Sequence, residues 1–277
     1  MITVTPYGGL ANRMRVVDSV YQLAKGNNAS IKVIWELSNE LNCQFSSLFE
    51  TSKDLQVDEI VLTNARKKIN EGIRRFFQLV KIRYPFGYSA CLYDKDITKY
   101  LETGYDFNEL IKNNNTLFIR TVHKFYEDVH SFKEFVPVPS LKEKIDGYAA
   151  QYSDNTIGLH IRRTDNKLSI KFSPLSGFTD LMDEAIIKYQ DAKFFLATDS
   201  PDVEELLYSK YGSRIISHPK TLDRNTPSGI QDSLVDLYCL ARTTRIVGSF
   251  YSSFSEVAAR INNIELIQVY KDSKESN

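Results

Sequence analysis

The feature that most constrains the fold of this 277-residue chain is a regular alternation of strand-like and helix-like segments in its C-terminal half. Short apolar runs alternate with longer segments in which apolar residues recur every three or four positions. Such alternation is typical of parallel sheets with right-handed helical crossovers. The expected strands are 156–162, 193–198, 214–217, 245–250 and 264–270, and the expected helices are 178–189, 200–212, 229–241 and 252–261.

A less regular version of the same alternation opens the chain. A β-branched stretch at 2–5 leads through Gly8 and Gly9 into a helical pattern that runs from Met14 to Ala24. This order of strand, tight turn and helix is the start of a parallel α/β unit. Further strands are expected at 30–36, 58–63 and 116–122, with a basic helix at 66–82.

Two prolines interrupt the alternation between the two halves. Pro137 and Pro139 lie within the segment 135–144, which has the composition of a connection. The length of the chain also suits two domains of about 100 to 200 residues each. We therefore expect an α/β protein with two Rossmann-like domains, residues 1–138 and 139–277.

The charge balance and the cysteines exclude several classes of protein. With 35 basic and 35 acidic side chains, the chain lacks the basic excess that binds nucleic acid or anionic membranes. A small anionic ligand stays compatible with this balance. Cys43, Cys91 and Cys239 fit neither a disulfide framework nor a zinc site, so we expect them reduced and buried. Without a signal-peptide pattern or an apolar run of about 18 residues, we expect a soluble, cytoplasmic protein with no membrane span.

Polar residues gather where the predicted strands end. Gly8–Arg13, His160–Asp165, Asp199 and Ser249–Ser253 each follow a strand. In open parallel sheets, ligands bind beyond the carboxyl ends of the strands, where helix N-termini present free backbone N–H groups. The adjacent guanidiniums of the second segment repel each other and match phosphate oxygens, which favours anion binding over a solvated salt-bridge cluster. The shared location predicts a ligand site.

Each of these residues also has a simpler structural interpretation. The glycine pair can be an ordinary strand-to-helix turn. His160 can be a satisfied core histidine, and Asp199 can be a helix-cap partner. Ser252 and Ser253 can cap the helix that follows them. Asp236 lies off the apolar stripe of its predicted helix, as a solvent-facing acid does.

Four segments resemble one family. HIRRTD, residues 160–165, resembles the H-x-R-R-x-D signature of GDP-fucose-dependent fucosyltransferases, the superfamily of α1,2-, α1,6- and protein O-fucosyltransferases. Residues 194–201 and 236–261 resemble the second and third regions of that family in the same order, and 8–14 is similar to its N-terminal glycine loop. The resemblance implies a GT-B-like fold, in which two Rossmann-like domains face a cleft. It does not extend to residues between about 40 and 130.

The resemblance also implies roles for single residues. Arg162 is the catalytic residue, which binds the β-phosphate and stabilises the charge that grows on the leaving diphosphate. Ser252 and Ser253 contact the same diphosphate, Asp236 pairs with guanine and His160 is a further nucleotide contact. Asp232, one helical turn before Asp236, is an unmatched rival as the reader of the base. The remaining members of the expected site are Arg163 and Asp165 as supports of the loop, Asp199, and the N-terminal loop residues Gly8, Gly9, Asn12 and Arg13.

Neither a general base nor a metal site is assigned. Between Asp165 and Asp180 there is no carboxylate, although the α1,6 enzymes carry a glutamate in this loop. Asp94 and Asp96 form a D-x-D pattern that could hold a metal on a nucleotide diphosphate. We disfavour that interpretation because neither aspartate follows a recognised strand end and Arg162 already supplies the positive charge. We expect no metal and no cofactor.

With this resemblance, the sequence predicts an inverting, metal-independent glycosyltransferase that transfers fucose from GDP-fucose. We expect the C-terminal domain to hold the donor and the N-terminal domain to face a glycan or lipid-linked oligosaccharide acceptor of bacterial surface polysaccharide biosynthesis. One alternative is a catalytically silent nucleotide-sugar-binding protein, and another is a transferase for a different GDP-linked sugar. A dinucleotide oxidoreductase is disfavoured because residues 8–13 lack the G-x-G-x-x-G spacing.

Overall fold

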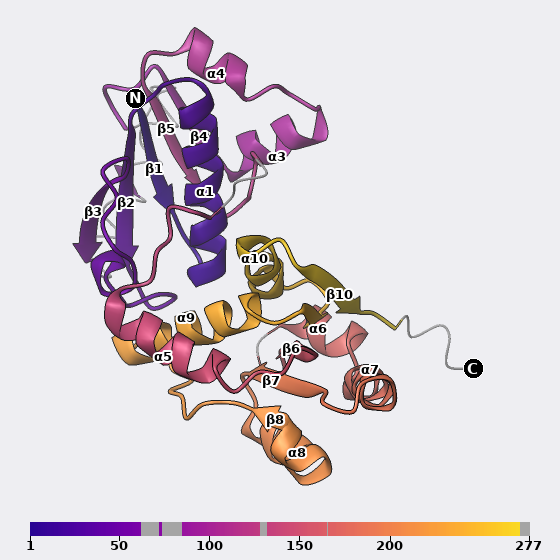
Figure 1. Cartoon of the computed structure of the whole chain (residues 1–277). Helices are drawn as coiled ribbons and strands as arrows, with labels where there is room; N and C mark the ends of the chain where they lie inside the picture. Colours follow the sequence, from indigo (N-terminus) through magenta and orange to yellow (C-terminus); the bar gives the residue numbers. More distant parts are fainter. Residues whose placement is uncertain (62–71, 74–84, 128–131, 165, 272–277) are drawn as a thin grey trace. The chain divides into compact units, whose positions relative to one another are not determined.

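The chain forms two compact units in this computed structural model, which describes residues 1–61, 72–73, 85–127, 132–164 and 166–271 (Figure 1). The first unit contains Met1–Val138 together with Asp223–Ile230, and the second contains Pro139–Leu222 and Gln231–Asn277. The short segment at 223–230 thus packs with the first unit, whereas the sequence analysis assigns it to the second domain.

The first unit is built on a parallel sheet with the strand order β3-β2-β1-β5-β4. Its strands are β1 (Ile2–Pro6), β2 (Ile31–Leu37), β3 (Gln56–Val61), β4 (Ala90–Tyr93) and β5 (Leu117–Thr121). Its helices include α1 (Leu10–Gly26), η1 (Phe45–Ser47), α3 (Asp94–Glu102) and α4 (Asn108–Asn113). The strands predicted here are present, and β4 is an additional one. Most of the helix predicted at 66–82 lies outside the described residues.

The second unit is a parallel sheet with the order β10-β9-β6-β7-β8. Its strands are β6 (Thr156–Ile161), β7 (Lys193–Thr198), β8 (Ile215–Ile216), β9 (Arg245–Ser249) and β10 (Glu265–Val269). Its helices are α5 (Pro139–Ala149), α6 (Lys167–Phe172), α7 (Leu175–Lys188), α8 (Pro201–Tyr211), η2 (Gly212–Arg214), α9 (Pro227–Ala241) and α10 (Ser253–Ile261), the first turn of α9 belonging to the first unit. Every strand and helix predicted in this half is present.

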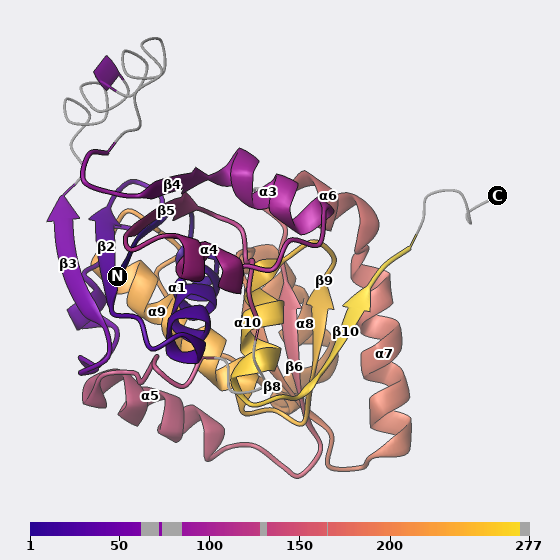
Figure 2. The same cartoon turned by 90° about the horizontal axis from the view of Figure 1, so that it is seen from above.

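Helices cover both faces of the second sheet. On one face, Phe178 of α7 and Leu207 of α8 pack with Leu159 of β6 in a buried apolar cluster. On the other face, strand glycines allow a close approach of α9 and α10. A Cβ atom on Gly158 would lie 2.9 Å from a side-chain carbon of Leu240, and one on Gly248 would lie 2.6 Å from Ser255 Oγ. Figure 2 shows β9 beside β10, with α10 next to β9.

The three cysteines are free thiols that differ in burial. Cys43 and Cys239 are buried free thiols, as predicted, but Cys91 is only half-buried because β4 lies at the edge of its sheet. Burial raises the pKa of Cys43 to about 11 and that of Cys239 to about 12.

Within the described ranges, no helix has the length and apolar character needed to cross a membrane.

Candidate functional site

The carboxyl ends of β6 and β9 lie side by side at the point where the strand order of the second sheet reverses. After β6 the chain continues to β7 and β8 on one side, while β9 and β10 are on the other. His160 in β6 is in register with Gly248 in β9. Such a reversal opens a crevice at the carboxyl edge of a parallel sheet, which is the usual place for a ligand. Two of the predicted segments, after β6 and after β9, meet here, and we call this place the β6/β9 site.

Two buried serines hold the strand ends together. Ser249 Oγ donates a hydrogen bond to the carbonyl of His160 (3.2 Å) and accepts one from the backbone N–H of Arg162 (3.0 Å). Ser173 Oγ accepts from the backbone N–H of Phe250 (2.8 Å) and donates to the carbonyl of Val269 (2.6 Å). Ser173 lies outside the recognised motifs, so sequence reasoning missed it. These bonds fix the backbone from which Arg162 projects.

Two polar atoms at this edge are buried without a partner. Among the described residues, neither His160 Nδ1 nor Ser252 Oγ has a hydrogen-bond partner. Ser252 is the N-cap residue of α10, but within the described chain its side chain makes no capping bond. An unsatisfied buried polar group costs about 1 to 3 kcal/mol. Two such groups beside one helix N-terminus fit a site that a polar ligand completes.

His160 is neutral under ordinary conditions. Its ring stacks on the ring of Phe254 with centroids 4.9 Å apart. Burial, followed by the positive charge of Arg162, lowers the pKa of His160 from 6.5 to about 4. A neutral imidazole offers one donor and one acceptor nitrogen, so Nδ1 can meet either a hydroxyl or a phosphate oxygen.

The two adjacent arginines have different surroundings. Arg163 donates from its guanidinium to the carbonyls of Arg162 (2.9 Å) and Ser173 (2.7 Å), and it lies 5.8 Å from the centre of the Phe178 ring. It therefore supports the loop from inside the second unit. Arg162 directly follows β6 and is half-buried, as Arg163 is. The bond from its backbone N–H to Ser249 places Arg162 at the carboxyl edge of the sheet.

Asp199 closes the same loop. Its Oδ1 accepts from the backbone N–H of Arg163 (2.6 Å), and its Oδ2 accepts from the backbone N–H (3.3 Å) and the hydroxyl (2.6 Å) of Thr164. The cap of α8 is supplied instead by Ser200, whose side chain accepts from the backbone N–H of Val203. Asp199 is thus a loop support in this structure. Asp165 lies outside the described residues.

Asp236 is a buried ion-paired carboxylate rather than a solvent-facing acid. Its Oδ1 lies 3.0 Å from His218 Nε2 and 3.0 Å from Lys220 Nζ, and its Oδ2 lies 2.8 Å from Lys220 Nζ. Burial alone would raise the pKa of Asp236, but Lys220 and His218 outweigh it and hold the pKa below its ordinary value. The charges of Asp236 and Lys220 both act on the pKa of His160, so these two side chains lie near the β6/β9 site.

The partners of Asp236 were missed by the sequence analysis. His218 and Lys220 follow β8 in a segment with no motif, and tertiary packing alone brings them to α9. One turn earlier on the helix, Asp232 Oδ2 accepts from the backbone N–H of Thr221 (2.9 Å) and is half-buried. Both acids therefore hold the segment after β8 to α9.

The N-terminal glycine loop lies in the first unit and matches the structural interpretation of a turn. Gly8 has φ = +85°, and a Cβ atom there would lie 3.1 Å from Asn12 Nδ2. Arg13 is 1% exposed and donates to the carbonyls of Gly8 and Glu36. Burial lowers the pKa of Arg13 to about 10. Gly9 is the N-cap residue of α1, and Arg13 joins the loop to β2 from within the unit.

The position of Asp94 corrects one part of the sequence analysis. Asp94 directly follows β4, so it does lie at a strand end; the four-residue strand at the sheet edge was too short to be recognised. Its carboxylate accepts from the hydroxyls of Tyr7 and Thr121 and from the backbone N–H of Val122. Asp96 accepts from the backbone N–H of Tyr93. In the described part of the chain, no group of three or more His, Cys, Asp or Glu residues is arranged to hold a metal ion.

Comparison with known proteins identifies the fold. No protein-family model matches the sequence, and no curated protein matches it. The solved structure of NodZ alpha-1,6-fucosyltransferase soaked with GDP-fucose superimposes with a TM-score of 0.63 at 18% identity, covering 94% of this chain and 92% of that one. This chain has the fold of this fucosyltransferase. The predicted GT-B-like α/β class is confirmed.

Two further structures share the fold. A mutant of FUT1 from Arabidopsis thaliana in complex with GDP gives a TM-score of 0.60 at 15% identity, over 98% of this chain and 70% of that one. POFUT1 in complex with GDP gives 0.56 at 12% identity, over 97% and 98%. The family suggested by the short motifs is therefore matched across nearly the whole chain at the level of the fold.

Proposed function

We propose that this chain is a glycosyltransferase that uses a GDP-linked sugar, with GDP-fucose as its donor. The observation that carries the proposal is the pair of buried polar atoms, His160 Nδ1 and Ser252 Oγ, which have no partner in the described chain and lie at the β6/β9 reversal near Arg162. A diphosphate supplies acceptor oxygens for the hydroxyl, for the guanidinium and for the free N–H groups of α10. Structures of proteins with the same fold were solved in complex with GDP or after soaking with GDP-fucose, which supports this donor.

The proposed reaction is a direct displacement with inversion. An acceptor hydroxyl attacks the anomeric carbon, and its proton passes to solvent water as the new glycosidic bond forms. The bond from that carbon to the diphosphate breaks, and its electron pair stays on the β-phosphate oxygen. Arg162 and the N-terminus of α10 stabilise the charge that grows there. These groups take the part that a divalent metal has in other transferases, so the proposed reaction needs no metal.

Recognition of guanine is proposed to involve the acids of α9. A carboxylate can accept two parallel hydrogen bonds from N1–H and the 2-amino group of guanine, which uracil and adenine cannot supply. Lys220 and His218 already occupy three of the roughly four lone-pair positions of Asp236. Guanine would therefore bind Asp236 with a shift of Lys220, while Asp232, with its single backbone bond, is the alternative reader.

The acceptor is proposed to be a glycan or lipid-linked oligosaccharide of bacterial surface polysaccharide biosynthesis, bound by the first unit. A cytoplasmic location fits a donor that is made in the cytoplasm. A catalytically silent protein that only binds GDP-sugars would retain the same phosphate contacts. Release of GDP from GDP-fucose, measured with and without glycan acceptors, distinguishes the enzyme from the binding protein.

Calorimetric titration of GDP, UDP and ADP tests the proposed donor, with Ser252→Ala as the decisive variant. We expect GDP to bind selectively and Ser252→Ala to weaken GDP binding by about tenfold, or about 1.4 kcal/mol. The stability of the free variant should be unchanged or higher, whereas loss of a capping serine would cost about 0.5 to 2 kcal/mol. Ser209→Ala, an exposed change on α8, is the matched control. Equal binding of all three nucleotides would overturn the guanine assignment.

A further inference from the structure

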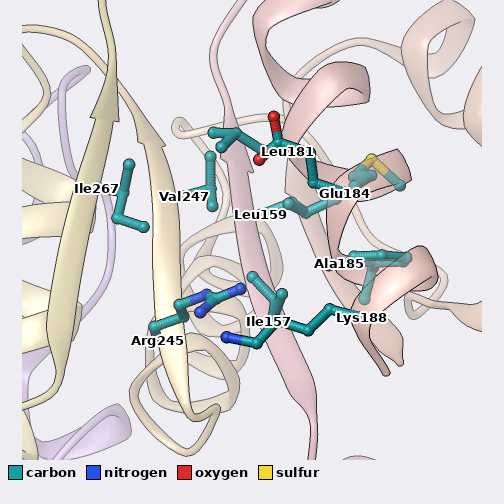
Figure 3. Close-up of a pocket in the computed structure, with 11 residues that line it drawn as sticks. Ile157, Leu159, Leu181, Glu184, Ala185, Lys188, Arg245, Val247 and Ile267 are labelled. Carbon is teal, nitrogen blue, oxygen red and sulfur yellow. The ribbon is translucent and has the colours of Figure 1, made fainter. Parts of the chain in front are cut away.

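A cavity of about 250 Å³ lies between α7 and the second sheet (Figure 3). The cavity is half open to solvent, and it is lined by apolar side chains from β6, β9, β10 and α7 together with the charged side chains of Glu184, Lys188 and Arg245. The apolar side chains of the lining include Ile157, Leu159, Val247, Ile267, Met182 and Ala185. We call it the α7 cavity.

The α7 cavity is separate from the β6/β9 site. Successive side chains of a strand point to opposite faces of a sheet, so Leu159 faces α7 whereas His160 faces Phe254 of α10. The cavity also reaches the amino ends of the strands, because Ile157 and Arg245 line it. A ligand in the cavity would therefore occupy the opposite face of the sheet from the proposed nucleotide.

The packing of α7 explains why space remains. Near the start of the helix, a Cβ atom on Gly177 would lie 2.5 Å from Val269, so the helix touches the sheet there. Two turns later the small side chain of Ala185, which is 2% exposed, faces the sheet. The half-open space beside Ala185 can therefore take a ligand that lies against the sheet.

Two cations face the same side of the cavity. Figure 3 shows the guanidinium of Arg245 and the ammonium of Lys188 close to Ile157, while the carboxylate of Glu184 lies at the other side, near Leu181. In the described part of the chain, Arg245 Nε is buried without a hydrogen-bond partner. A guanidinium nitrogen without a partner beside apolar side chains can donate a charge-assisted hydrogen bond to the anionic group of an amphiphilic ligand.

The acids nearest to Arg245 and Lys188 do not pair with these two cations. Lys188 contacts the ring of Tyr189, with its ammonium 5.0 Å from the ring centre. Glu265 is in register with Arg245 across β9 and β10. Over the described ranges, neither Arg245 nor Lys188 forms an ion pair with Glu265 or Glu184. The two cations are thus not neutralised by the nearest acids.

We propose that the α7 cavity binds a small anionic amphiphile, a medium-chain carboxylate whose chain lies between α7 and the strands and whose carboxylate meets Arg245 and Lys188. A cavity of about 150 Å³ holds benzene, with its six carbons. By that measure, the volume of about 250 Å³ suits about ten non-hydrogen atoms, the size of octanoate. The guanidinium fork of Arg245 matches the two carboxylate oxygens.

Titration of the full chain with octanoate, octanol and acetate tests this proposal, with calorimetry and thermal shift as readouts. We expect saturable binding of octanoate, binding of octanol at least about tenfold weaker because it lacks the charge, and no saturable binding of acetate. Arg245→Gln should lower octanoate affinity by about tenfold and leave octanol affinity unchanged. Lys144→Gln, an exposed change on α5, should alter neither.

Blocking the cavity provides the second half of the test. Ala185→Leu should fill the space and abolish binding of both octanoate and octanol, and Ala185→Val serves if the larger side chain prevents folding. Removal of the acid beside Arg245, in Glu265→Gln, should strengthen octanoate binding. Arg162→Ala should leave octanoate binding intact, which separates this site from the proposed nucleotide site. Octanoate that binds no better than octanol, or that still binds when Ala185 is enlarged, would overturn the proposal.

Discussion

The ammonium of Lys220 lies 2.8 Å from Oδ2 of Asp236, and the two side chains are only 6% and 9% exposed. This buried ion pair joins the segment after β8 to the middle of α9. Taking two charges out of water is costly, and their attraction offsets that cost only while both partners are present. The Asp236 carboxylate also lies 3.0 Å from His218 Nε2. Loss of this carboxylate would therefore leave both Lys220 and His218 without their buried partner.

Asp236→Asn should therefore destabilise the fold by about 3 kcal/mol, because the ammonium of Lys220 is left buried without a counter-charge. Asp232→Asn is the matched control one turn earlier: it removes the charge from a half-buried group that accepts one backbone N–H, and should cost about 1 kcal/mol or less. Urea denaturation of both variants measures the difference. Equal losses would mean that the Lys220 pair contributes nothing specific.

The adjacent arginines should respond differently to alanine. Arg162→Ala should lower turnover about a hundredfold or more, which corresponds to a loss of about 3 kcal/mol of transition-state stabilisation. The stability of the fold should change little. Arg163→Ala should lower stability by about 1 to 3 kcal/mol, because the carbonyls of Arg162 and Ser173 lose their donors. Urea denaturation and release of GDP from GDP-fucose are measured on both variants. An Arg162→Ala protein with wild-type turnover would refute its assignment to the leaving group.

Most of the second unit could be predicted because the residues that begin and end its helices and strands are close together in the sequence. Ser200 at the cap, Pro201 at the first position and Gly212 beyond the end define α8 in the sequence, and the structure places the helix at Pro201–Tyr211. The edge strand β4 gave no comparable signal, because four residues are too few for a period to be recognised. The attachment of 223–230 to the first unit depends on contacts that no local pattern encodes.

The candidate site could be predicted only in outline. Parallel strand order explains why the segments containing Arg162 and Ser252 meet at one edge. Which of the two arginines turns inward depends on the positions of Ser173 and Phe178, which belong to other elements. The burial of Asp236 and its pairing with Lys220 are tertiary as well. The sequence therefore predicts which residue types occur at the candidate site and in which order, but not the side chains that these residues contact.

The stability of the chain should fall as pH rises from about 6.5 to about 8, which is above the range in which the lowered pKa of buried His160 makes stability rise with pH. Burial, together with the negative charge of Asp18, raises the pKa of Glu134 from 4.5 to about 8. Between these values the unfolded chain has released a proton that the folded chain retains, so the contribution of Glu134 to stability decreases with pH by up to about 1.4 kcal/mol per pH unit. Glu134→Gln should flatten this dependence in urea denaturation, whereas Glu143→Gln, an exposed change on α5, should not. The same slope in both variants would contradict the assignment.

Chelators should leave the proposed transferase active. The Asp94 carboxylate already accepts bonds from Tyr7, Thr121 and Val122, so it is not open to a metal without rearrangement, and Arg162 supplies the positive charge at the proposed phosphate position. Turnover of GDP-fucose is measured with excess EDTA and after addition of magnesium or manganese. Loss of turnover with EDTA and its recovery with manganese would instead favour metal binding at Asp94.

The reader of the base can be identified by comparing GDP with inosine diphosphate, which lacks the 2-amino group. If Asp236 accepts both guanine donors, Asp236→Asn presents a donor to one of them and should weaken GDP binding by about 2 to 4 kcal/mol. Inosine diphosphate should lose less affinity than GDP in the same variant, because one of the two contacts is absent from the start. Calorimetry on Asp236→Asn and Asp232→Asn, each confirmed as folded by circular dichroism, assigns the role to the acid whose change removes the preference for GDP. If neither variant alters GDP affinity and UDP binds equally well, guanine is not read by α9.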